Sequence, residues 1–532
     1  MIPGHDIQIP GMRFPFSFIL CAWFFAFPLD AAASGRIDPS GISGSLVLSG
    51  IGLPDEGIDR FNELAGGKEM RVVILRADAG KSAEQLATRI RRRCEEKDLP
   101  APVLAASGPD QDVGKTIAAI NRATGVWLLG QDGEAIRDGL ASPGLRASVS
   151  TVMNRGGVVG GCGAGCPAFA VDGLSLLPGA VIAVHDGEVD EASQLDEVLR
   201  KRPFLVGYEI GREAALIVRG RRVTVTGKGE AVISLAAVTG QKAKRIVLQG
   251  RDAVADLSAL RFAALARSKE PFPAAKPPLP RLDHGTLMII GGGAMPRGIV
   301  PEFIEKAGGD KASIVVLPTA MPDPIPEKSS IADTFRRAGA GQVAVLTGRK
   351  LQQVESDEYL EVLRKATGIW FGGGRQWRFA DAYLDTKAQK LMHEVLARDG
   401  VIMGSSAGAS IQADYLARAN PLGNREIIAE GYERGLGFIR GVAIDQHFAQ
   451  RKRFKDMSLL VARYPQLLGI GIDEGTALIV EGEIGRVVGS GSVHFYDREK
   501  PVIKGEPDYE SVHDGGSYQL VKRDIIDAGK PR

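Results

Sequence analysis

The chain has 532 residues, with 66 Lys and Arg against 64 Asp and Glu and a formal net charge of +2. Single hydrophobic cores stop growing at about 250–300 residues, so this length predicts two or more domains. The 44% hydrophobic and 24% charged residues are typical of a globular protein and exclude a disordered, fibrous or coiled-coil one. The balanced charge gives no electrostatic footprint for nucleic acid, and four Cys are too few for a disulfide scaffold.

The N-terminus has the pattern of a secretory signal. Arg13 precedes an apolar run over residues 14–27, and Ala31, Ala32 and Ala33 offer small residues for cleavage before Ser34. This run is shorter than the roughly 20 residues that a membrane anchor needs. We therefore expect residues 1–33 to be a cleaved signal peptide and the mature protein to be secreted or periplasmic, without membrane contact. An oxidising compartment would permit a disulfide between Cys162 and Cys166, which the spacing alone leaves open.

The sequence contains an internal repeat. Four segments recur in the same order, namely 44–50 as 285–291, 123–127 as 366–370, 155–160 as 399–404, and 203–220 as 465–482. Chance similarity explains one such match but not four in order, so we infer a tandem duplication. The predicted parts are a front domain at 34–262, a Pro-rich linker at 263–283 and a back domain at 284–532.

Each half alternates short apolar runs with helical patterns. Residues 313–317 and 401–403 are apolar enough for buried strands, and residues 381–396 have the periodicity of an amphipathic helix. This alternation predicts an α/β fold with a mostly parallel sheet and helices on both faces.

A candidate nucleophile lies in Gly404-Ser405-Ser406-Ala407-Gly408, a G-x-S-x-G motif between an apolar strand and a helical segment. In this context the small residues allow a sharp turn that exposes the central serine, Ser406. The amides that open the next helix point at developing negative charge. A Gly/Ser-rich turn without catalytic function is the alternative.

A candidate base is His447, which directly follows an apolar strand. Histidine at the end of a strand is placed at the open edge where α/β active sites form. Arg451 and Arg453 follow in the same segment and could bind substrate carboxylates through their guanidinium groups. A structural histidine and a solvated basic face are the alternatives for these residues.

The acid that orients His447 is open at this point. Glu474 ends another apolar strand and could accept the ring N–H, while Glu426 and Glu430 are rivals between Ser406 and His447. The glycine turn 372–374 also follows an apolar strand, so its amides, Gly374 among them, are candidate oxyanion donors beside Ala407.

These residues resemble the cyanophycinases, in the peptidase clan that also holds aspartyl dipeptidase (peptidase E). The resemblance rests on the Gly-Ser-Ser-Ala-Gly-Ala elbow, the glycine turn ending in Gln376, the Asp-Gln-His-Phe box with its arginines, and the Gly-Ile-Asp-Glu-x-Thr-Ala strand, over roughly residues 282–500. The elbow is widespread, but the Asp-Gln-His-Phe box looks specific to cyanophycinases.

The resemblance implies a flavodoxin-like or class I glutamine amidotransferase-like three-layer fold in each half. It implies a Ser406-His447-Glu474 triad without metal or cofactor, and cleavage of multi-L-arginyl-poly-L-aspartate into β-Asp-Arg dipeptides, usually by a homodimer. The substrate pocket would be lined by Gln376, Asp445, Gln446, Arg451 and Arg453.

Two residues depart from the family pattern: Arg375 stands where Asp is usual, and Asp456 stands where a third Arg is usual. Both put the substrate preference in doubt rather than the reaction type. An aspartyl or isoaspartyl peptidase acting on short peptides is therefore one alternative. A non-catalytic protein that binds an Asp-rich polymer is another.

The front half has lost most of these catalytic and pocket residues. Our alignment sets Cys162 on Ser406, His185 on His447 and Arg212 on Glu474, and it replaces Asp445, Gln446 and both arginines. A Cys-His dyad remains an alternative. We expect instead a retired domain that replaces the second subunit of the family's dimer, so that one chain is a pseudo-dimer.

Overall fold

The computed structural model describes residues 38–77, 80–106, 112–130, 132–184, 190–326 and 328–530. The predicted signal peptide and His185 lie outside these residues. Within them, no helix is long and apolar enough to cross a membrane.

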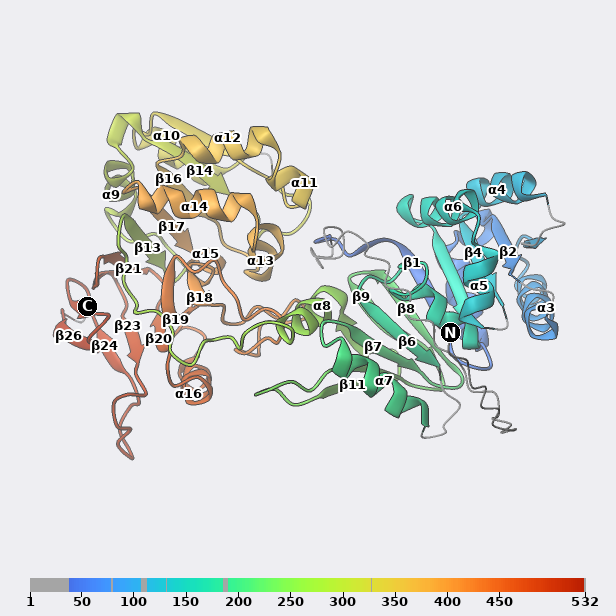
Figure 1. The fold of residues 1–532 in the computed structure, drawn as a ribbon. Coiled ribbons are helices and arrows are strands. Elements are labelled where there is room, and N and C mark those ends of the chain that lie inside the picture. The colour runs from blue at the N-terminus through green and yellow to red at the C-terminus, as the bar shows by residue number, and fades with distance from the viewer. Residues whose placement is uncertain are drawn as a thin grey trace, which may run out of the picture. The chain divides into compact units, whose positions relative to one another are not determined.

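The back half is built around a nine-stranded sheet in the order β15-β14-β16-β17-β13-β21-β22-β25-β26 (Figure 1). The strands from β15 to β13 pair in parallel, and β21 onward pair antiparallel. Their bounds are β13 (Thr286–Ile290), β14 (Ser313–Leu317), β15 (Gln342–Val345), β16 (Gly368–Phe371), β17 (Val401–Ser405), β21 (Thr476–Glu481), β22 (Ile484–Gly489), β25 (Ser517–Gln519) and β26 (Asp524–Asp527).

A second sheet contains the strands that the candidate base and acid follow. Its order is β18-β19-β20-β23-β24, with β18 (Ala413–Tyr415), β19 (Ile439–Gln446), β20 (Leu468–Ile472), β23 (Val493–Tyr496) and β24 (Glu510–Val512). The helices of this half are α9 (Ile299–Lys306), η3 (Gly309–Lys311), α10 (Ser330–Arg337), α11 (Leu351–Val354), α12 (Asp357–Lys365), α13 (Trp377–Tyr383), α14 (Lys387–Ala397), α15 (Ala407–Ser410) and α16 (Phe454–Arg463).

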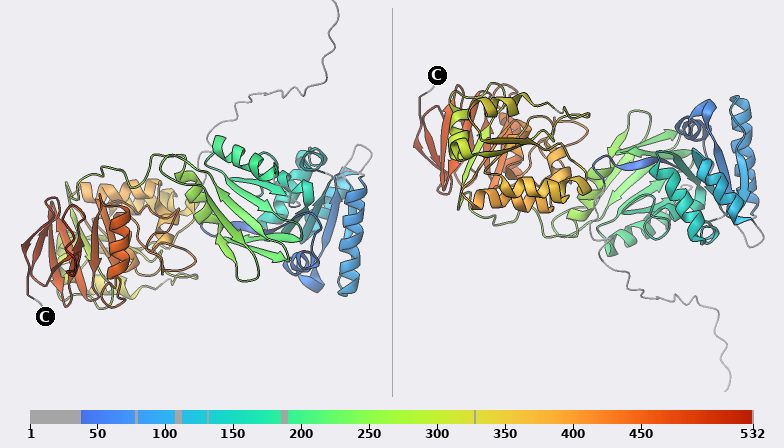
Figure 2. Two further views of the ribbon diagram at one scale, coloured as in Figure 1. Left: turned by 90° about the horizontal axis from the view of Figure 1, so that it is seen from below. Right: turned by 90° about the horizontal axis from the view of Figure 1, so that it is seen from above.

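Both faces of the central sheet are buried. Met288 and Ile290 of β13 pack in one core with α9 and α10, while Leu287 and Ile289 pack in another with α12 and α14. Helices therefore cover the sheet from both sides, as Figures 1 and 2 show. A continuous apolar strand has this environment because neither face meets water.

The front half follows the same plan. Its eight-stranded sheet has the order β12-β9-β8-β1-β5-β4-β2-β3, and its four-stranded sheet has the order β11-β10-β7-β6. Read from β3, the larger sheet matches the back sheet read from β15, strand for strand, as far as β22. The strands are β1 (Ile42–Ser49), β2 (Val72–Arg76), β3 (Val103–Ala106), β4 (Gly125–Leu129), β5 (Val158–Cys162), β6 (Ala180–Val184), β7 (Val206–Ile210), β8 (Ala214–Gly220), β9 (Arg222–Gly227), β10 (Ala231–Leu235), β11 (Lys244–Leu248) and β12 (Val254–Asp256).

The front helices are α2 (Asp55–Leu64), η1 (Gly67–Glu69), α3 (Lys81–Glu96), α4 (Val113–Arg122), α5 (Gly133–Gly139), α6 (Pro143–Asn154), η2 (Gly163–Phe169), α7 (Asp190–Lys201) and α8 (Leu257–Ala266). The predicted linker boundary at 263 falls inside α8, because the apolar face of that helix stays buried as far as Ala264.

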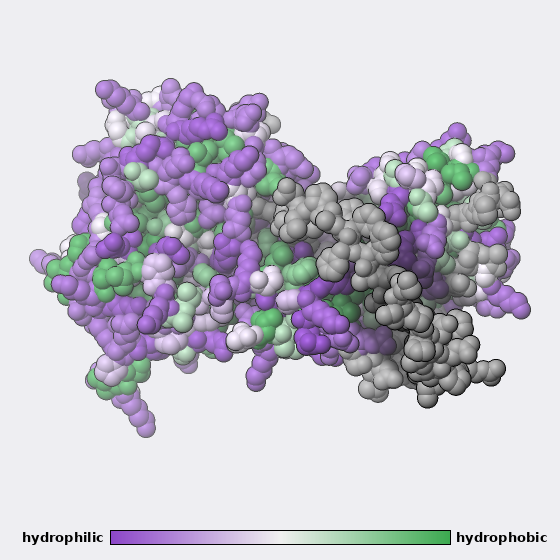
Figure 3. Space-filling model, in the orientation of Figure 1, coloured by the Kyte–Doolittle hydropathy of each residue, from purple (hydrophilic) through white to green (hydrophobic). Residues whose placement is uncertain are grey.

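The predicted α/β class with mostly parallel sheets is confirmed. One predicted helix, at 381–396, is in fact two. Tyr383 ends α13, Asp385 takes a positive φ of 58°, and the Thr386 side chain accepts the Gln389 amide as the cap of α14. The coloured surface in Figure 3 is mainly hydrophilic, with apolar residues in small scattered groups.

Candidate active site

Ser406 occupies a strained turn between β17 and α15. Its φ of 57° and ψ of −115° are unusual for a residue with a side chain, and its amide donates to Ile290 O at 3.1 Å. The motif glycines are required by packing. A Cβ at Gly404 would lie 2.6 Å from the Gly408 carbonyl carbon, and one at Gly408 would lie 2.6 Å from that of Phe371. The elbow predicted from the motif is therefore present.

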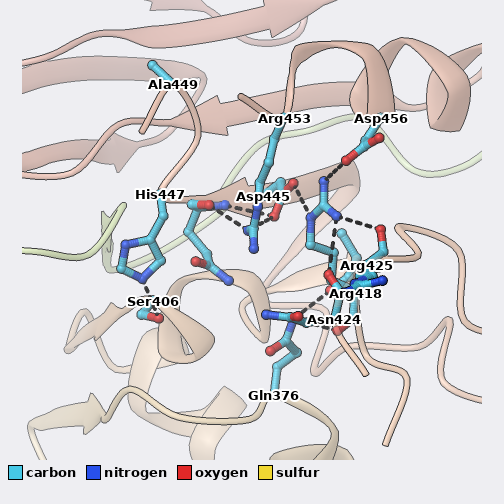
Figure 4. A network of polar contacts seen from close by, with 12 residues as sticks. Gln376, Ser406, Arg418, Asn424, Arg425, Asp445, His447, Ala449, Arg453 and Asp456 are labelled. Atoms are coloured by element: carbon cyan, nitrogen blue, oxygen red, sulfur yellow. Dashed lines mark hydrogen bonds and ion pairs between the residues drawn. The ribbon is translucent and has the colours of Figure 1, made fainter. Parts of the chain in front are cut away.

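His447 connects Ser406 to Glu474. Its Nε2 lies 2.9 Å from Ser406 Oγ and its Nδ1 lies 2.5 Å from Glu474 Oε1. His447 directly follows β19, and Glu474 follows the neighbouring parallel strand β20 after one residue. Figure 4 shows the ring directed at Ser406. The three predicted side chains are thus within hydrogen-bonding distance in the order that nucleophile activation requires.

The two rival carboxylates have other partners. Glu426 accepts from Asn420 Nδ2 at 3.0 Å. Glu430 pairs with Lys244 at 2.7 Å and with Arg267. Of the three candidates, Glu474 is the one hydrogen-bonded to His447.

The surroundings of His447 favour its neutral form. Burial lowers the pKa of the imidazole, and the charges of Arg451 and Arg453 lower it further, while Glu474 acts in the opposite direction. A neutral imidazole has a free nitrogen lone pair and can take the proton of Ser406 Oγ.

A glycine triplet after β13 makes room for the histidine and the glutamate. A Cβ at Gly292 would lie 2.7 Å from both ring nitrogens of His447, and one at Gly293 would lie 2.9 Å from Glu474 Cβ. The sequence analysis did not assign a function to this triplet. The sequence signal for this triplet was three consecutive glycines directly after an apolar strand. The turn at 372–374 has the same pattern.

Two polar side chains position the segment that follows His447. Asp473 Oδ1 accepts the Ala449 amide at 2.9 Å, and Gln450 Oε1 accepts the Glu474 amide at 2.9 Å. His447 has a positive φ of 50°, so its backbone needs such support. Neither residue was predicted as part of the site.

The glycine turn after β16 lies beside the nucleophile. A Cβ at Gly373 would be 3.6 Å from Ser406 Cβ, whereas Gly374, at a φ of 140°, abuts the Ala320 carbonyl. The Ala407 amide donates no hydrogen bond to any described residue. Of the predicted oxyanion donors, Ala407 directly follows Ser406, whereas the turn glycine nearest to Ser406 is Gly373 rather than the predicted Gly374.

Both predicted glutamines are buried. Gln376 is buried, and its Nε2 donates to Ala417 O at 2.8 Å and to Arg418 O at 3.0 Å. Gln446 Oε1 is buried with no hydrogen-bond partner among the described residues. Arg451 is exposed, and no ion pair of its side chain is found within the described part of the chain.

Asp445 and Arg453 belong to a buried ionic network with two residues outside the predicted set. Asp445 is fully buried; one oxygen accepts Arg453 Nη1 at 2.7 Å and the other accepts Arg418 Nε at 2.7 Å. Arg418 Nη2 in turn binds Asp456 at 2.5 Å (Figure 4). Both Asp445 oxygens therefore accept hydrogen bonds from arginines, and the carboxylate has no exposure to solvent.

The front half shows that our alignment was wrong by one residue at the elbow. Cys162 pairs with Ser49 in the way that Ser405 pairs with Ile290 in the back half. The position of Ser406 is then held by Gly163, whose φ of 58° matches that of Ser406. The glycine pairs 156–157 and 160–161 can each be aligned in two ways with the single glycines Gly400 and Gly404, and strand pairing shows which alignment is right.

The front half therefore has no nucleophile at its elbow. Burial raises the pKa of the Cys162 thiol to about 11, so it is not ionised at neutral pH. Cys94, Cys162 and Cys166 are all free and buried. Nowhere in the described residues are three or more His, Cys, Asp or Glu side chains grouped to hold a metal ion.

Known proteins resemble the back half. The model of peptidase family S51 matches residues 287–488. Cyanophycinase from Trichormus variabilis is 30% identical over 236 residues, which cover 43% of this chain and 78% of the relative. Cyanophycinase from Synechococcus elongatus is 33% identical over 221 residues, covering 40% and 68%. The crystal structure of a peptidase from an acI-B1 Actinobacterium aligns at 24% identity and a TM-score of 0.33, covering 44% of this chain and 97% of that one. The chain belongs to peptidase family S51 and is a serine-type peptidase.

Proposed function

We propose that the chain is an exported peptidase that hydrolyses cyanophycin, multi-L-arginyl-poly-L-aspartate, to β-Asp-Arg dipeptides. The observation that carries this proposal is the bridge from Ser406 Oγ through His447 to Glu474, at 2.9 and 2.5 Å, in a chain similar to cyanophycinases. Export rests on the signal pattern of residues 1–33.

The chemistry follows from the geometry of the three side chains. Ser406 Oγ attacks the scissile carbonyl while His447 Nε2 takes its proton, and Glu474 holds Nδ1 and stabilises the imidazolium. The developing oxyanion is bound by amides of Ala407 and of the turn at 372–374. His447 then donates the proton to the leaving amine, and water hydrolyses the acyl-enzyme by the reverse proton path.

The substrate is held by the polar wall beside Ser406. Gln376 and Gln446 supply amide groups, and Arg451 and the free guanidinium nitrogens of Arg453 bind substrate carboxylates. Asp445 acts indirectly, because its two oxygens fix Arg453 and Arg418.

We propose in addition that the two halves arose by tandem duplication and that the front half serves as a non-catalytic partner, a pseudo-dimer within one chain. Support comes from the shared strand order of the two large sheets and from the Gly163 elbow. Light scattering of the mature protein tests the pairing: a monomeric mass is expected, and a stable homodimer would contradict it.

The decisive experiment is product analysis by mass spectrometry. Mature protein from Ser34, as wild type and as Ser406→Ala, is incubated with cyanophycin and with α- and β-linked Asp dipeptides. Release of β-Asp-Arg from the polymer by the wild type alone is the expected result. Cleavage of dipeptides but not of polymer would favour the second candidate, an aspartyl or isoaspartyl peptidase. The departures Arg375 and Asp456 are the observation behind that candidate.

Two other outcomes would overturn the proposal. Polymer cleavage that survives in Ser406→Ala would remove the proposed nucleophile. Polymer binding without cleavage by the wild type would indicate a binding protein of the Asp-rich polymer, the third reading of the sequence.

A further inference from the structure

A buried arginine of the front half contacts the helix that follows the glycine turn of the back half. Arg221 lies at the tip of the hairpin between β8 and β9, and its side chain is 12% exposed. Asp256 of the same half accepts its Nε at 2.9 Å and its Nη2 at 2.8 Å. Asp256 is itself fixed as the cap of α8, where it accepts the Ala259 amide at 2.9 Å. The front half therefore fixes the orientation of this guanidinium.

Three side chains of the back half meet the same guanidinium. Arg221 Nη1 pairs with Asp381, and the guanidinium carbon lies 4.3 Å from the centre of the Trp377 ring. Trp377 and Asp381 are four positions apart, so they lie on one face of α13. Tyr432 Oη accepts Arg221 Nη2 at 2.7 Å and donates to Asp381 at 2.6 Å. Arg221 thus binds a carboxylate, an aromatic ring and a hydroxyl group at once.

The surroundings of this contact are closely packed. A Cβ at Gly431 would lie 2.3 Å from the carbonyl oxygen of Ala259 in α8, and Phe262 of α8 meets the Tyr432 ring edge-on at 5.3 Å. Asp381 is 3% exposed, and burial raises the pKa of its carboxyl to about 6, while the charge of the arginine acts in the opposite direction. The arginine therefore favours the ionised form of this buried carboxyl.

Trp377 connects this contact to the glycine turn at 372–374. It is the first residue of α13 and lies three positions after the turn. The guanidinium of Arg378 lies over the same ring at 4.9 Å, and Arg378 Nη1 donates to Ala320 O at 2.9 Å. The Ala320 oxygen also accepts the Arg375 amide at 2.9 Å. The segment that follows the turn is therefore tied to α13 both along the chain and through a shared carbonyl.

The turn at 372–374 lies beside Ser406, and its amides are candidate oxyanion donors. We propose that Arg221 is a positioning residue for the active site: through Trp377 and Asp381 it fixes α13 and, with α13, the amides of the turn. The front half then contributes to catalysis without a catalytic residue of its own. This inference rests on the proposed function and names the group through which the front half acts on that site.

The alternative is that Arg221 only joins the two halves. The other face of α13 packs in the core, with Phe379 and Tyr383 fully buried, and in this case that packing holds the helix by itself. The two roles differ in the quantity that they affect. A joining residue changes stability, whereas a residue that positions oxyanion donors changes kcat and leaves KM nearly constant.

The experiment uses the full mature chain with Arg221→Met, which keeps an apolar stem and removes the guanidinium. Cyanophycin hydrolysis, thermal unfolding and hydrogen exchange of the amides at 372–383 are measured. We expect kcat to fall about tenfold with KM changed by less than about twofold, because complete loss of an oxyanion donor costs about 100- to 1,000-fold and the turn is only displaced here. Exchange at 372–383 should become faster.

Arg245→Met is the matched control. Arg245 also pairs with a buried carboxylate, that of Glu209, at 3.0 and 3.1 Å, but both residues belong to the front half. This variant should keep the wild-type kcat and the wild-type exchange at 372–383, even where its unfolding temperature is lower. An equal fall of kcat in the control, or a wild-type kcat in Arg221→Met, would overturn the inference and leave the proposed function standing.

Tyr432→Phe decides the question where Arg221→Met does not fold. It removes only the hydroxyl that bridges Arg221 and Asp381. We expect kcat to fall about threefold at constant KM, the effect of one typical hydrogen bond. An unchanged kcat in this variant would overturn the inference as well. Failure of the wild type to cleave cyanophycin would instead overturn the proposed function itself.

Discussion

Gly292→Ala tests whether the placement of His447 is what makes Ser406 reactive. A Cβ at position 292 would lie 2.7 Å from both ring nitrogens and closer still to Cε1, and ordinary contacts begin at 3.4 Å, so the ring must move by more than 0.7 Å. Such a shift of the ring would break the hydrogen-bond geometry between His447 Nε2 and Ser406 Oγ, which are 2.9 Å apart. Displacements near 1 Å at a reacting group cost about 100-fold in rate.

The expected result is a fall of about 100-fold in kcat with KM changed by less than about twofold, because the substrate wall is untouched. The assay is steady-state hydrolysis of cyanophycin, with thermal unfolding measured in parallel. Alanine at a positive φ is itself strained by about 1–2 kcal/mol, so loss of stability has to be separated from loss of chemistry.

Gly298→Ala separates the two effects. Gly298 also has a positive φ, 83°, but a Cβ there would meet nothing within 4 Å. It carries the backbone strain of Gly292→Ala without the contact to His447. If both variants were to keep kcat within about twofold of the wild type, the reasoning from ring placement would be refuted.

Three further predictions concern charge and the front half. Arg451→Met should move the acid limb of the kcat/KM profile upward in pH, because Arg451 lowers the pKa of the His447 base; Arg337→Met, on an exposed helix, should leave the limb in place. Burial raises the pKa of Glu433 to about 7, so the folded state loses stability as pH rises from 4.5 to 7; Glu433→Gln should unfold at higher denaturant than wild type at pH 8 and equally at pH 4. Cys162→Ala should retain full cyanophycin cleavage, and a loss with unchanged stability would restore the front half as a catalytic site.

The core of the candidate site could be predicted because it lies at strand ends. Ser406 follows β17, His447 follows β19 and Glu474 follows β20, each directly or after one residue. The carboxyl ends of parallel strands meet at one edge, so side chains placed there by sequence are brought together by topology. The residues alone left Glu474, Glu426 and Glu430 open, and the family resemblance implied Glu474. The structure shows Glu474 hydrogen-bonded to His447, because the strand before it, β20, is the neighbour of β19.

The residues that support the catalytic side chains gave no comparable signal in the sequence. Arg418 lies in an irregular segment between β18 and β19 with a positive φ of 57°, and its role depends on contacts with Asp445 and Asp456, which lie 27 and 38 residues away. The family resemblance implied that Asp445 lines the pocket. Burial of its carboxylate between two arginines is a tertiary effect that strand position does not reveal.

The front half differs from the candidate site of the back half at three separate places. Gly163 has no hydroxyl at the elbow, Arg212 stands where the alignment has Glu474, and Ile51 follows β1 at the position of Gly292, where any side chain would meet a histidine ring. Restoring a serine at 163 would therefore leave two obstacles in place. The central strand has kept its packing, with Leu46, Val47 and Leu48 fully buried. A buried core without a catalytic site is what our proposal of a non-catalytic partner within one chain requires of the front half.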